Sequence, residues 1–451
     1  MERTFKVTQD QIKSMLDLKT QSKIFSLDLS EFGPYYMDYS RDGTHMVIAG
    51  QKGHIATFDW KTGKLGCEIH LGEQVKDVKY FHNESLFAVA QKKYTYIYDK
   101  QGLEIHCLRR HEQVNKLDFL PYHFLLATVG NTGVLRYLDV STGANVADLR
   151  TGLGKCNVMS HNPQNGVIHL GHNAGQVTLW SPNSTTPLVK MLAHKGPLSA
   201  LSVDPSGKYM ATAGLDSQVK IWDLRTYRCL QEYFSPAPVH SMDISGTGLL
   251  GLGFGPHVTI WKDAFTQKAQ SPYMSHLEAG SRILDVRFCP YEDVLGFGHD
   301  QGISSIIIPG AGDMNYDGLE VNPNATKKQR QEGEVQALLH KLQPDMISLD
   351  PDMIGGIMPT SQAANVQAHR AEAKANSETG KIQPKHKMRG KSSSLRRYLR
   401  KQGNVIDGKR EALRANLEKK KQAREMRLRK EKGEVVDTYD ALSRFTSKPR
   451  F

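Results

Sequence analysis

The sequence predicts an all-β protein, a seven-bladed β-propeller followed by a helical and extended basic C-terminal tail. Three observations lead to this fold class: short β-rich segments, turn residues between them, and a repeat of about 40 residues. The segment from His194 to Asp223 shows the unit most clearly, since Pro, Gly and Asp turns separate three short strands. One copy of such a meander cannot bury both of its faces, so the pattern should recur along the chain.

Seven copies of the unit follow one another. We aligned them on the last residues of their third strand, which are Phe58-Asp59, Tyr98-Asp99, Leu138-Asp139, Trp180-Ser181, Trp222-Asp223, Trp261-Lys262 and Ile307-Ile308. Successive copies lie 39 to 46 residues apart. Most copies lack a tryptophan at this point, so the period rather than a single motif predicts seven blades.

The fifth copy resembles a WD40 repeat, because a histidine leads into it and Trp222-Asp223 ends it. The resemblance implies a structural tetrad in which a histidine, a strand hydroxyl, a turn aspartate and a strand tryptophan are hydrogen-bonded in series. The matching residues are His194, Thr212, Asp216 and Trp222. A buried polar chain of this kind rigidifies its blade, so we assign His194 and Asp216 a structural role and no catalytic one.

The last copy has three predicted strands and no fourth, because the turn at Pro309-Gly310 interrupts the pattern. The alternating segment 24–29 belongs to no blade of its own. We therefore expect it to pair as the outer strand of the last blade, which would close the ring and remove an exposed edge. The propeller would then span residues 24–310.

Helices are predicted on both sides of the propeller. Residues 1–23 are expected to form an N-terminal helix, with Thr8 and Gln11 at capping-box spacing and Ile12, Met15 and Leu16 on one face. Residues 311–376 are expected to hold a helix over Lys327–Gln343, ended by Pro344, and an extended linker. The apolar stripe of this helix consists of Val335, Leu338, Leu339 and Leu342. The stripe could dock either onto the propeller or onto another protein, and the sequence leaves both alternatives open.

The positive charge of the chain is concentrated in one segment. Residues 381–433 hold 20 Lys/Arg against 5 Asp/Glu, a net charge of +15, whereas the whole chain carries +12, so the remainder sums to −3. A localised basic block indicates a polyanionic partner or a nuclear address. Within residues 377–451, a largely extended tail, a polar helix is expected near 409–432.

The basic tail is the predicted RNA-binding element. Lysine and arginine side chains that meet phosphates give affinity without reading sequence, and a single tyrosine among them leaves little room for base recognition. The predicted RNA-contacting residues are Lys385, Lys387, Arg389, Lys391, Arg396, Arg397, Tyr398, Arg400, Lys401, Lys419, Lys420, Lys421, Arg424, Arg427, Arg429 and Lys430. The alternative is a nuclear-localisation signal, and both roles are compatible.

Patterns typical of enzymes and cofactor sites find structural explanations, so we predict no enzyme, no cofactor and no metal site. The glycines of residues 251–255 lack the helix of a dinucleotide loop and are predicted to lie in a close-packed strand. His169 and His172 are expected to straddle a strand end and to diverge. The five cysteines form no CxxC pair, which argues against zinc and suits a reducing compartment. We expect a soluble intracellular protein, because neither a signal peptide nor an apolar membrane span is present.

From about Ser275 onward the chain resembles the BING-type C-terminal domain of a family of WD-repeat ribosome-biogenesis factors, the U-three-protein-seven family of the small-subunit processome. The motifs that carry this resemblance are Asp285–Pro290, Gly298–Gly302, Asn322-Pro323, Thr326–Arg330, Glu334-Val335, Leu338-Leu339, Ser392–Lys401 and Asn404–Asp407. The family also leads us to expect a longer basic extension before the propeller than the 23 residues that precede it here.

The resemblance implies a nucleolar, non-enzymatic scaffold that is needed for maturation of small-subunit ribosomal RNA. Its partners would be precursor ribosomal RNA, U3 small nucleolar RNA and other processome proteins, including WD-repeat proteins, with no membrane and no small-molecule substrate. A propeller that serves as substrate adaptor in a nuclear ubiquitin-ligase or chromatin complex is the alternative.

Overall fold

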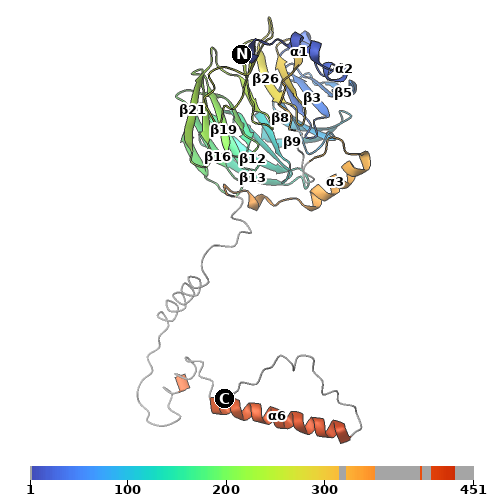
Figure 1. Cartoon of the computed structure of the whole chain (residues 1–451), viewed down its shortest axis with the longest axis vertical. Helices are drawn as coiled ribbons and strands as arrows, with labels where there is room; N and C mark the ends of the chain where they lie inside the picture. The colour runs from blue at the N-terminus through green and yellow to red at the C-terminus, as the bar shows by residue number, and fades with distance from the viewer. Residues whose placement is uncertain (1–2, 314–320, 351–396, 399–407, 432–451) are drawn as a thin grey trace. The chain divides into compact units, whose positions relative to one another are not determined.

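The structure is a computed structural model that describes residues 3–313, 321–350, 397–398 and 408–431. The chain divides into two units, Met1–Gly356 and Ile357–Phe451, which we describe separately. The first unit contains seven antiparallel sheets of four strands, arranged as the blades of a propeller (Figure 1). The predicted fold class is therefore confirmed.

The first four blades follow the chain order, and each sheet is a simple meander. Blade 1 consists of β2 (Tyr35–Tyr39), β3 (His45–Gly50), β4 (His54–Asp59) and β5 (Lys64–His70). Blade 2 consists of β6 (Val75–Tyr80), β7 (Leu86–Gln91), β8 (Tyr94–Asp99) and β9 (Glu104–Glu112). Blade 3 consists of β10 (Val114–Leu120), β11 (Leu125–Gly130), β12 (Val134–Asp139) and β13 (Asn145–Arg150). Blade 4 consists of β14 (Cys156–His161), β15 (Ile168–His172), β16 (Gln176–Trp180) and β17 (Val189–Leu192).

The remaining blades complete the ring. Blade 5 consists of β18 (Leu198–Val203), β19 (Tyr209–Gly214), β20 (Gln218–Asp223) and β21 (Arg228–Phe234). Blade 6 consists of β22 (Ser241–Ile244), β23 (Leu250–Phe254), β24 (His257–Trp261) and β25 (Met274–Leu277). Blade 7 consists of β26 (Ile283–Phe288), β27 (Val294–His299), β28 (Gly302–Ile307) and β1 (Ser26–Asp28). The aligned strand ends of the repeat coincide, to within one residue, with the end of the third strand of every blade.

The hydrophobic core lies between neighbouring blades, since a sheet in a propeller is covered on both faces. Every residue of β11, β23 and β27 is buried, as expected for second strands sandwiched on both sides. Outer strands instead alternate, as in β21, where exposed and less exposed residues follow one another. The blades thus form one continuous ring of packed sheets.

The ring closes through the N-terminal segment. Strand β1 pairs antiparallel with β28, and Leu27 lies opposite Ile303. The strand is shorter than the expected segment 24–29, although the backbone bond from Ser305 N–H to the Phe25 carbonyl extends the pairing. Ile24, Phe25 and Leu29 pack against the core that blades 7 and 1 share.

The expected single helix over residues 1–23 is wrong. This segment contains a 3-10 turn, η1 (Thr4–Lys6), and two short helices, α1 (Gln9–Met15) and α2 (Leu18–Gln21). Leu16 and Asp17 are extended, and the Gln21 side chain holds the bend by donating to the carbonyls of Lys13 and Leu16. Ile12 and Leu16 pack against the propeller core, but Met15 points to solvent.

The segment after the propeller, residues 321–350, is called the C-terminal strap. It contains α3 (Lys327–Leu339) and the turn η3 (Pro344–Met346). The helix ends before the predicted Gln343, because the chain turns onto blade 3 and Leu342 N–H donates to the Tyr122 carbonyl. In the second unit, the helix α6 (Gly408–Glu431) occupies the region where a polar helix is expected. No helix in the described ranges is long and apolar enough to span a membrane.

Candidate docking surfaces and nucleic-acid interface

The structure brings together the four residues of the tetrad in blade 5. His194 lies in the link between blades 4 and 5, and both of its ring nitrogens are hydrogen-bonded. Nδ1 lies 3.2 Å from the Asp216 carboxylate, and Nε2 lies 3.0 Å from Thr212 Oγ1. Trp222 Nε1 donates to the same hydroxyl at 3.0 Å. Burial lowers the pKa of His194, while the Asp216 carboxylate opposes this effect. The chain ties the link between two blades to the middle strands of blade 5, which is a structural role.

Two related polar contacts, one between blades 2 and 3 and one within blade 4, are absent from the sequence prediction. His111 Nδ1 lies 2.7 Å from Thr128 Oγ1, and His172 Nε2 lies 2.7 Å from Thr178 Oγ1. Trp180 Nε1 also donates to Thr178, so this hydroxyl links an imidazole and an indole as Thr212 does. The sequence signal for the His111 contact was its spacing: His111 and Thr128 are 17 residues apart, and His194 and Thr212 of the tetrad are 18 residues apart.

Carboxylates on the first strands connect neighbouring blades around the central channel. Each accepts a hydrogen bond from a backbone N–H of the next blade, and the pairs are Asp38 with Tyr80 (3.0 Å), Asp77 with Leu117 (2.8 Å), Asp243 with Phe288 (2.8 Å) and Asp285 with Met37 (3.2 Å). The last of these crosses the junction between blades 7 and 1. Hydrogen bonds to a charged acceptor are stronger than neutral ones, so these aspartates reinforce the ring where the blades converge.

The channel holds cations that balance most of these carboxylates. It is a cavity of about 430 Å³. Lys79 Nζ lies 3.1 Å from Asp38 and 3.8 Å from Asp118, and Lys116 Nζ lies 3.1 Å from Asp77. Burial raises the pKa of Asp77, whereas His161 and Lys79 outweigh burial at Asp118 and lower the pKa of that carboxyl. Blades 4 and 5 contribute mainly neutral residues to the wall, such as Met159 and Ser199. The polar groups are largely satisfied by one another, which indicates a structural network.

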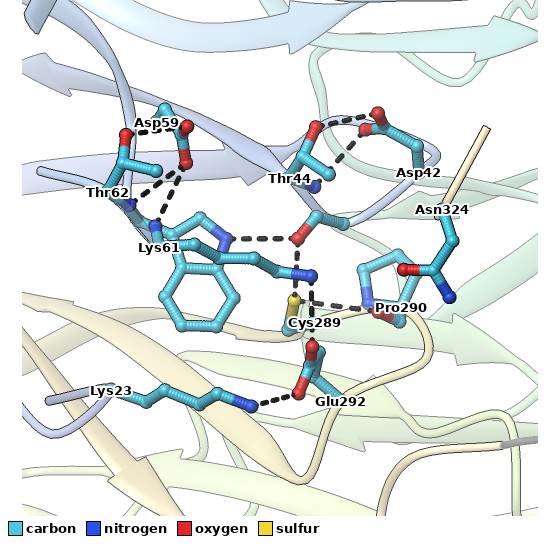
Figure 2. A network of polar contacts seen from close by, with 12 residues as sticks. Lys23, Asp42, Thr44, Asp59, Lys61, Thr62, Cys289, Pro290, Glu292 and Asn324 are labelled. Carbon is cyan, nitrogen blue, oxygen red and sulfur yellow. Dashed lines mark hydrogen bonds and ion pairs between the residues drawn. The ribbon is translucent and has the colours of Figure 1, made fainter. Parts of the chain in front are cut away.

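A second network secures the seam between blades 7 and 1 (Figure 2). Glu292, in the loop after β26, lies 2.5 Å from Lys23 of the N-terminal segment and 2.9 Å from Lys61 of blade 1. The Gly43 carbonyl accepts hydrogen bonds from Trp60 Nε1 (3.1 Å) and from the Cys289 thiol (3.6 Å). Gly43 has a φ of +64°, and a Cβ there would lie 2.4 Å from the Pro290 carbonyl oxygen, so a larger residue would separate the two blades.

The C-terminal strap runs along the loops of blades 2, 3 and 4. Glu334 lies 3.0 Å from His82, and Lys341 binds Asp139 and Ser141. Burial acts to raise the pKa of Asp139, but hydrogen bonds from Lys341, Ser141 and Thr142, together with the charge of Lys341, outweigh it and lower that pKa. At blade 4, the Ile347 carbonyl accepts from Ser181 Oγ at 2.7 Å, and the Ile347 side chain is 2% exposed within the core. The strap is therefore an integral part of the propeller unit.

The apolar stripe of α3 does not face the propeller. Polar groups hold this helix, since Arg330 pairs with Glu84 as Glu334 does with His82. Val335, Leu338 and Leu339 are all exposed. Leu342 alone reaches a small cavity between blades 3 and 4, where Tyr122 and His123 also line the wall. The first three residues of the stripe are therefore exposed, and the fourth, Leu342, lies against blades 3 and 4.

Part of the predicted RNA-binding set lies on described residues. Lys419, Lys420, Lys421, Arg424 and Arg427 are exposed on α6, whose 24 residues extend about 36 Å. Arg397 is exposed and Tyr398 is half-buried in a short helical turn. Arg429 and Lys430 lie in α6, but their side chains are outside the described residues, as are Lys385, Lys387, Arg389, Lys391, Arg396, Arg400 and Lys401.

The motifs that resemble enzyme sites lie in the packed blades. Gly251 and Gly253 belong to β23, where added Cβ atoms would lie 3.0 Å from Phe288 and 2.7 Å from Val286. His169 and His172 both lie within β15, rather than straddling its end as expected. Residues three apart in a strand face opposite sides, so these imidazoles do diverge. The five cysteines are free thiols.

Comparison with known proteins matches both parts of this architecture. The BING4CT (NUC141) domain model matches residues 272–350, and the WD domain, G-beta repeat model matches residues 185–223. U3 small nucleolar RNA-associated protein 7 of Saccharomyces cerevisiae is 46% identical over 99% of this chain and 86% of its own length. WD repeat-containing protein 46 of Homo sapiens is 45% identical over 92% of this chain and 69% of its own length. The chain therefore belongs to the family that contains U3 small nucleolar RNA-associated protein 7 and WD repeat-containing protein 46.

The structure clarifies what the family's BING4CT domain is. Its matched range begins before the outer strand of blade 6, includes β26 to β28 of blade 7, and ends with the strap. The domain boundary in the sequence therefore lies inside the propeller. This chain cannot be divided into a propeller and a separate C-terminal domain at this boundary without cutting through blade 6.

Proposed function

We propose that this protein is an assembly factor in ribosome biogenesis, a WD-repeat scaffold of the small-subunit processome that supports maturation of small-subunit ribosomal RNA. The observation that carries the proposal is the similarity to U3 small nucleolar RNA-associated protein 7 over nearly the whole chain, including the basic tail. A nucleolar location and an association with U3 small nucleolar RNA and precursor ribosomal RNA follow from the same proposal.

The propeller supplies the protein-docking part of this scaffold. Its blades are joined through the channel carboxylates, the seam and the strap, so the surface loops are held on a rigid ring. The exposed stripe of Val335, Leu338 and Leu339 on α3 offers an apolar surface for another processome protein. Neither role requires catalysis, which agrees with a scaffold.

The tail supplies the RNA-binding part. Helix α6 is strongly polar and carries exposed lysines and arginines. Such a helix gains little stability from packing against a protein core. Phosphates would neutralise these charges, and binding would release counterions from the RNA. Because Tyr398 is the single aromatic residue among the basic clusters, recognition would follow the backbone more than the bases.

Sedimentation tests the proposal directly. Full-length tagged protein in a nuclear extract should co-sediment with large pre-ribosomal particles, and RNase treatment should release it to light fractions. Recovery of U3 small nucleolar RNA with the tagged protein is the accompanying positive result. Co-purification with ubiquitin-ligase subunits in a complex that resists RNase would instead favour the adaptor function.

A charge series tests the role of the tail. Replacing Arg396, Arg397, Arg400 and Lys401 together by serine should reduce the salt slope of RNA binding by about 3, because each phosphate contact on single-stranded RNA contributes about 0.7. The loss should be similar for unrelated RNAs. The matched control replaces four exposed propeller lysines, Lys64, Lys92, Lys195 and Lys268, and should leave the slope unchanged. If the tail variant with a foreign import signal still concentrates in the nucleolus and binds pre-ribosomes, the tail is an address and the propeller is the main anchor.

A further inference from the structure

Three side chains of blade 1 form a cluster of potential metal ligands on the outer half of the sheet. His54 begins β4, and Glu68 and His70 lie near the end of β5. His54 is directly opposite His70 in the strand register, and Glu68 is two residues away on the same face of the sheet. His54 Nε2 lies 3.2 Å from Glu68 Oε1, and His70 Nε2 lies 3.8 Å from the same oxygen. All three ligand atoms lie within 4.8 Å of one another.

These separations suit a tetrahedral ion. With metal–ligand bonds of about 2.0–2.2 Å, two ligands of a tetrahedral site lie about 3.3 Å apart. The pair formed by His54 and Glu68 already has this separation, and the distance from His70 Nε2 to Glu68 Oε1 must shorten by about half an ångström. The side chains of Glu68 and His70 are 49% and 56% exposed, so they can make this adjustment, whereas the His54 side chain is buried.

The surroundings orient the buried imidazole for this role. The Tyr35 hydroxyl lies 2.9 Å from His54 Nδ1, which leaves Nε2 directed at the other two ligands. Phe32 packs against both imidazoles, with its ring centroid 5.0 Å from each. These contacts hold the His54 ring in one orientation, with Nε2 facing Glu68.

We propose that His54, Glu68 and His70 bind a divalent transition-metal ion, for which Zn²⁺ is the best fit, with a fourth position open to water or to a partner's side chain. Two imidazoles and one carboxylate are a zinc ligand set, and the small number of oxygen ligands disfavours Ca²⁺ and Mg²⁺. Phe32 lies in η2 (Ser30–Phe32), directly after the closing strand β1. Metal binding would therefore stabilise the place where the closing segment enters blade 1.

Another group of ligand-type residues is a poorer candidate. Asp42, His45 and Glu84 also lie within 4.8 Å of one another. Asp42 already accepts hydrogen bonds from Ser40 and Thr44, and Glu84 pairs with Arg330 of the strap. These side chains are committed to groups outside the cluster, whereas the ion pairs of Glu68 described above are with the two histidines of its own cluster.

The test is calorimetric titration of the chelator-treated full-length protein with ZnCl₂ alone. We expect one site with a Kd in the micromolar range or below, and a melting temperature that rises with zinc. Glu68→Gln and His70→Ala should each weaken binding at least tenfold and remove the thermal shift. Both residues are exposed, so the variants should fold, and their melting temperature without metal should match that of the unaltered protein.

Blade 2 offers a matched control. Glu104 and His106 repeat the same Glu-x-His pair on the outer strand β9, but His106 lies opposite Ile97 instead of a histidine. His106→Ala should leave zinc affinity unchanged. Titration with CoCl₂ should give visible d–d bands without a thiolate charge-transfer band, which excludes the free cysteines as ligands. The proposal is overturned if the protein binds zinc no tighter than millimolar, if His106→Ala weakens binding as much as His70→Ala, or if a thiolate band appears.

Discussion

Blades 5 and 7 are secured in different ways. Blade 5 contains four consecutive strands, and a buried chain from His194 through Thr212 to Trp222 locks it from inside. Blade 7 takes its outer strand from the start of the chain, and ion pairs of Glu292 hold the joint at its surface. The difference indicates that stability is local in blade 5, while in blade 7 it depends on bringing together segments about 280 residues apart.

Removal of residues 1–30 should have the largest effect. The deletion takes away β1, the Lys23 ion pair and eight half-buried apolar side chains, so we expect a loss of about 3–5 kcal/mol in the free energy of unfolding. Denaturant unfolding measures it, with tryptophan fluorescence as the signal. Deletion of residues 1–7 is the control, because it shortens the same terminus and leaves α1 and β1 in place. Equal melting of the long truncation and the full-length protein would mean that β1 does not close the ring.

Asp216→Ala tests the internal lock of blade 5. It leaves His194 Nδ1 without its partner in a buried site, which should cost about 1–3 kcal/mol. RNA affinity of the folded protein should not change. The control is Asp300→Ala in the corresponding turn of blade 7, where an exposed pair with Arg282 should contribute less than about 1 kcal/mol. Reduced RNA affinity at unaltered stability would move Asp216 from the structural tetrad to a binding site.

The seam should respond to a smaller change. Glu292→Gln keeps the shape of the side chain but removes the charge that holds Lys23 and Lys61. Both pairs are partly exposed, so we expect a loss of about 1 kcal/mol or less, and still less at high salt. Unfolding in low and high NaCl measures this. A loss independent of salt would show that packing, rather than charge, holds the seam.

Long-range regularity is what made this fold predictable from sequence. The repeat of strand ends and the missing fourth strand of blade 7 are features of whole segments, so they survive the absence of tryptophan in most blades. The channel aspartates were missed because each partner is a backbone N–H in the next blade, as with Asp77 and Leu117, and a backbone group leaves no mark in the sequence. Their recurrence at 39 residues from Asp38 to Asp77 was a usable signal.

Elements held by single polar contacts were predicted less well. The bend between α1 and α2 has no Pro or Gly to announce it, and α3 ends where Leu342 bonds to Tyr122, a contact made only in the folded chain. The strap's anchors, such as Lys341 with Asp139, join residues about 200 positions apart. Periodicity carries information about neighbours along an element, whereas these contacts depend on where elements meet.

Acid titration should separate the two blades by the pH at which each weakens. The folded pKa of His194 is lowered by burial, so as pH falls below about 6.5 the unfolded chain takes up a proton first and stability declines. At Glu292, burial acts to raise the pKa, but Lys23 and Lys61 outweigh it and lower it, so the unfolded carboxyl takes up a proton first below about 4.5. The stability difference between the unaltered protein and His194→Gln should therefore narrow from pH 7 to pH 5. The difference for Glu292→Gln should stay constant over that range and narrow only in stronger acid. Urea unfolding at each pH measures both differences, and parallel curves for the two variants would show that the two blades are not distinguished by their titratable groups.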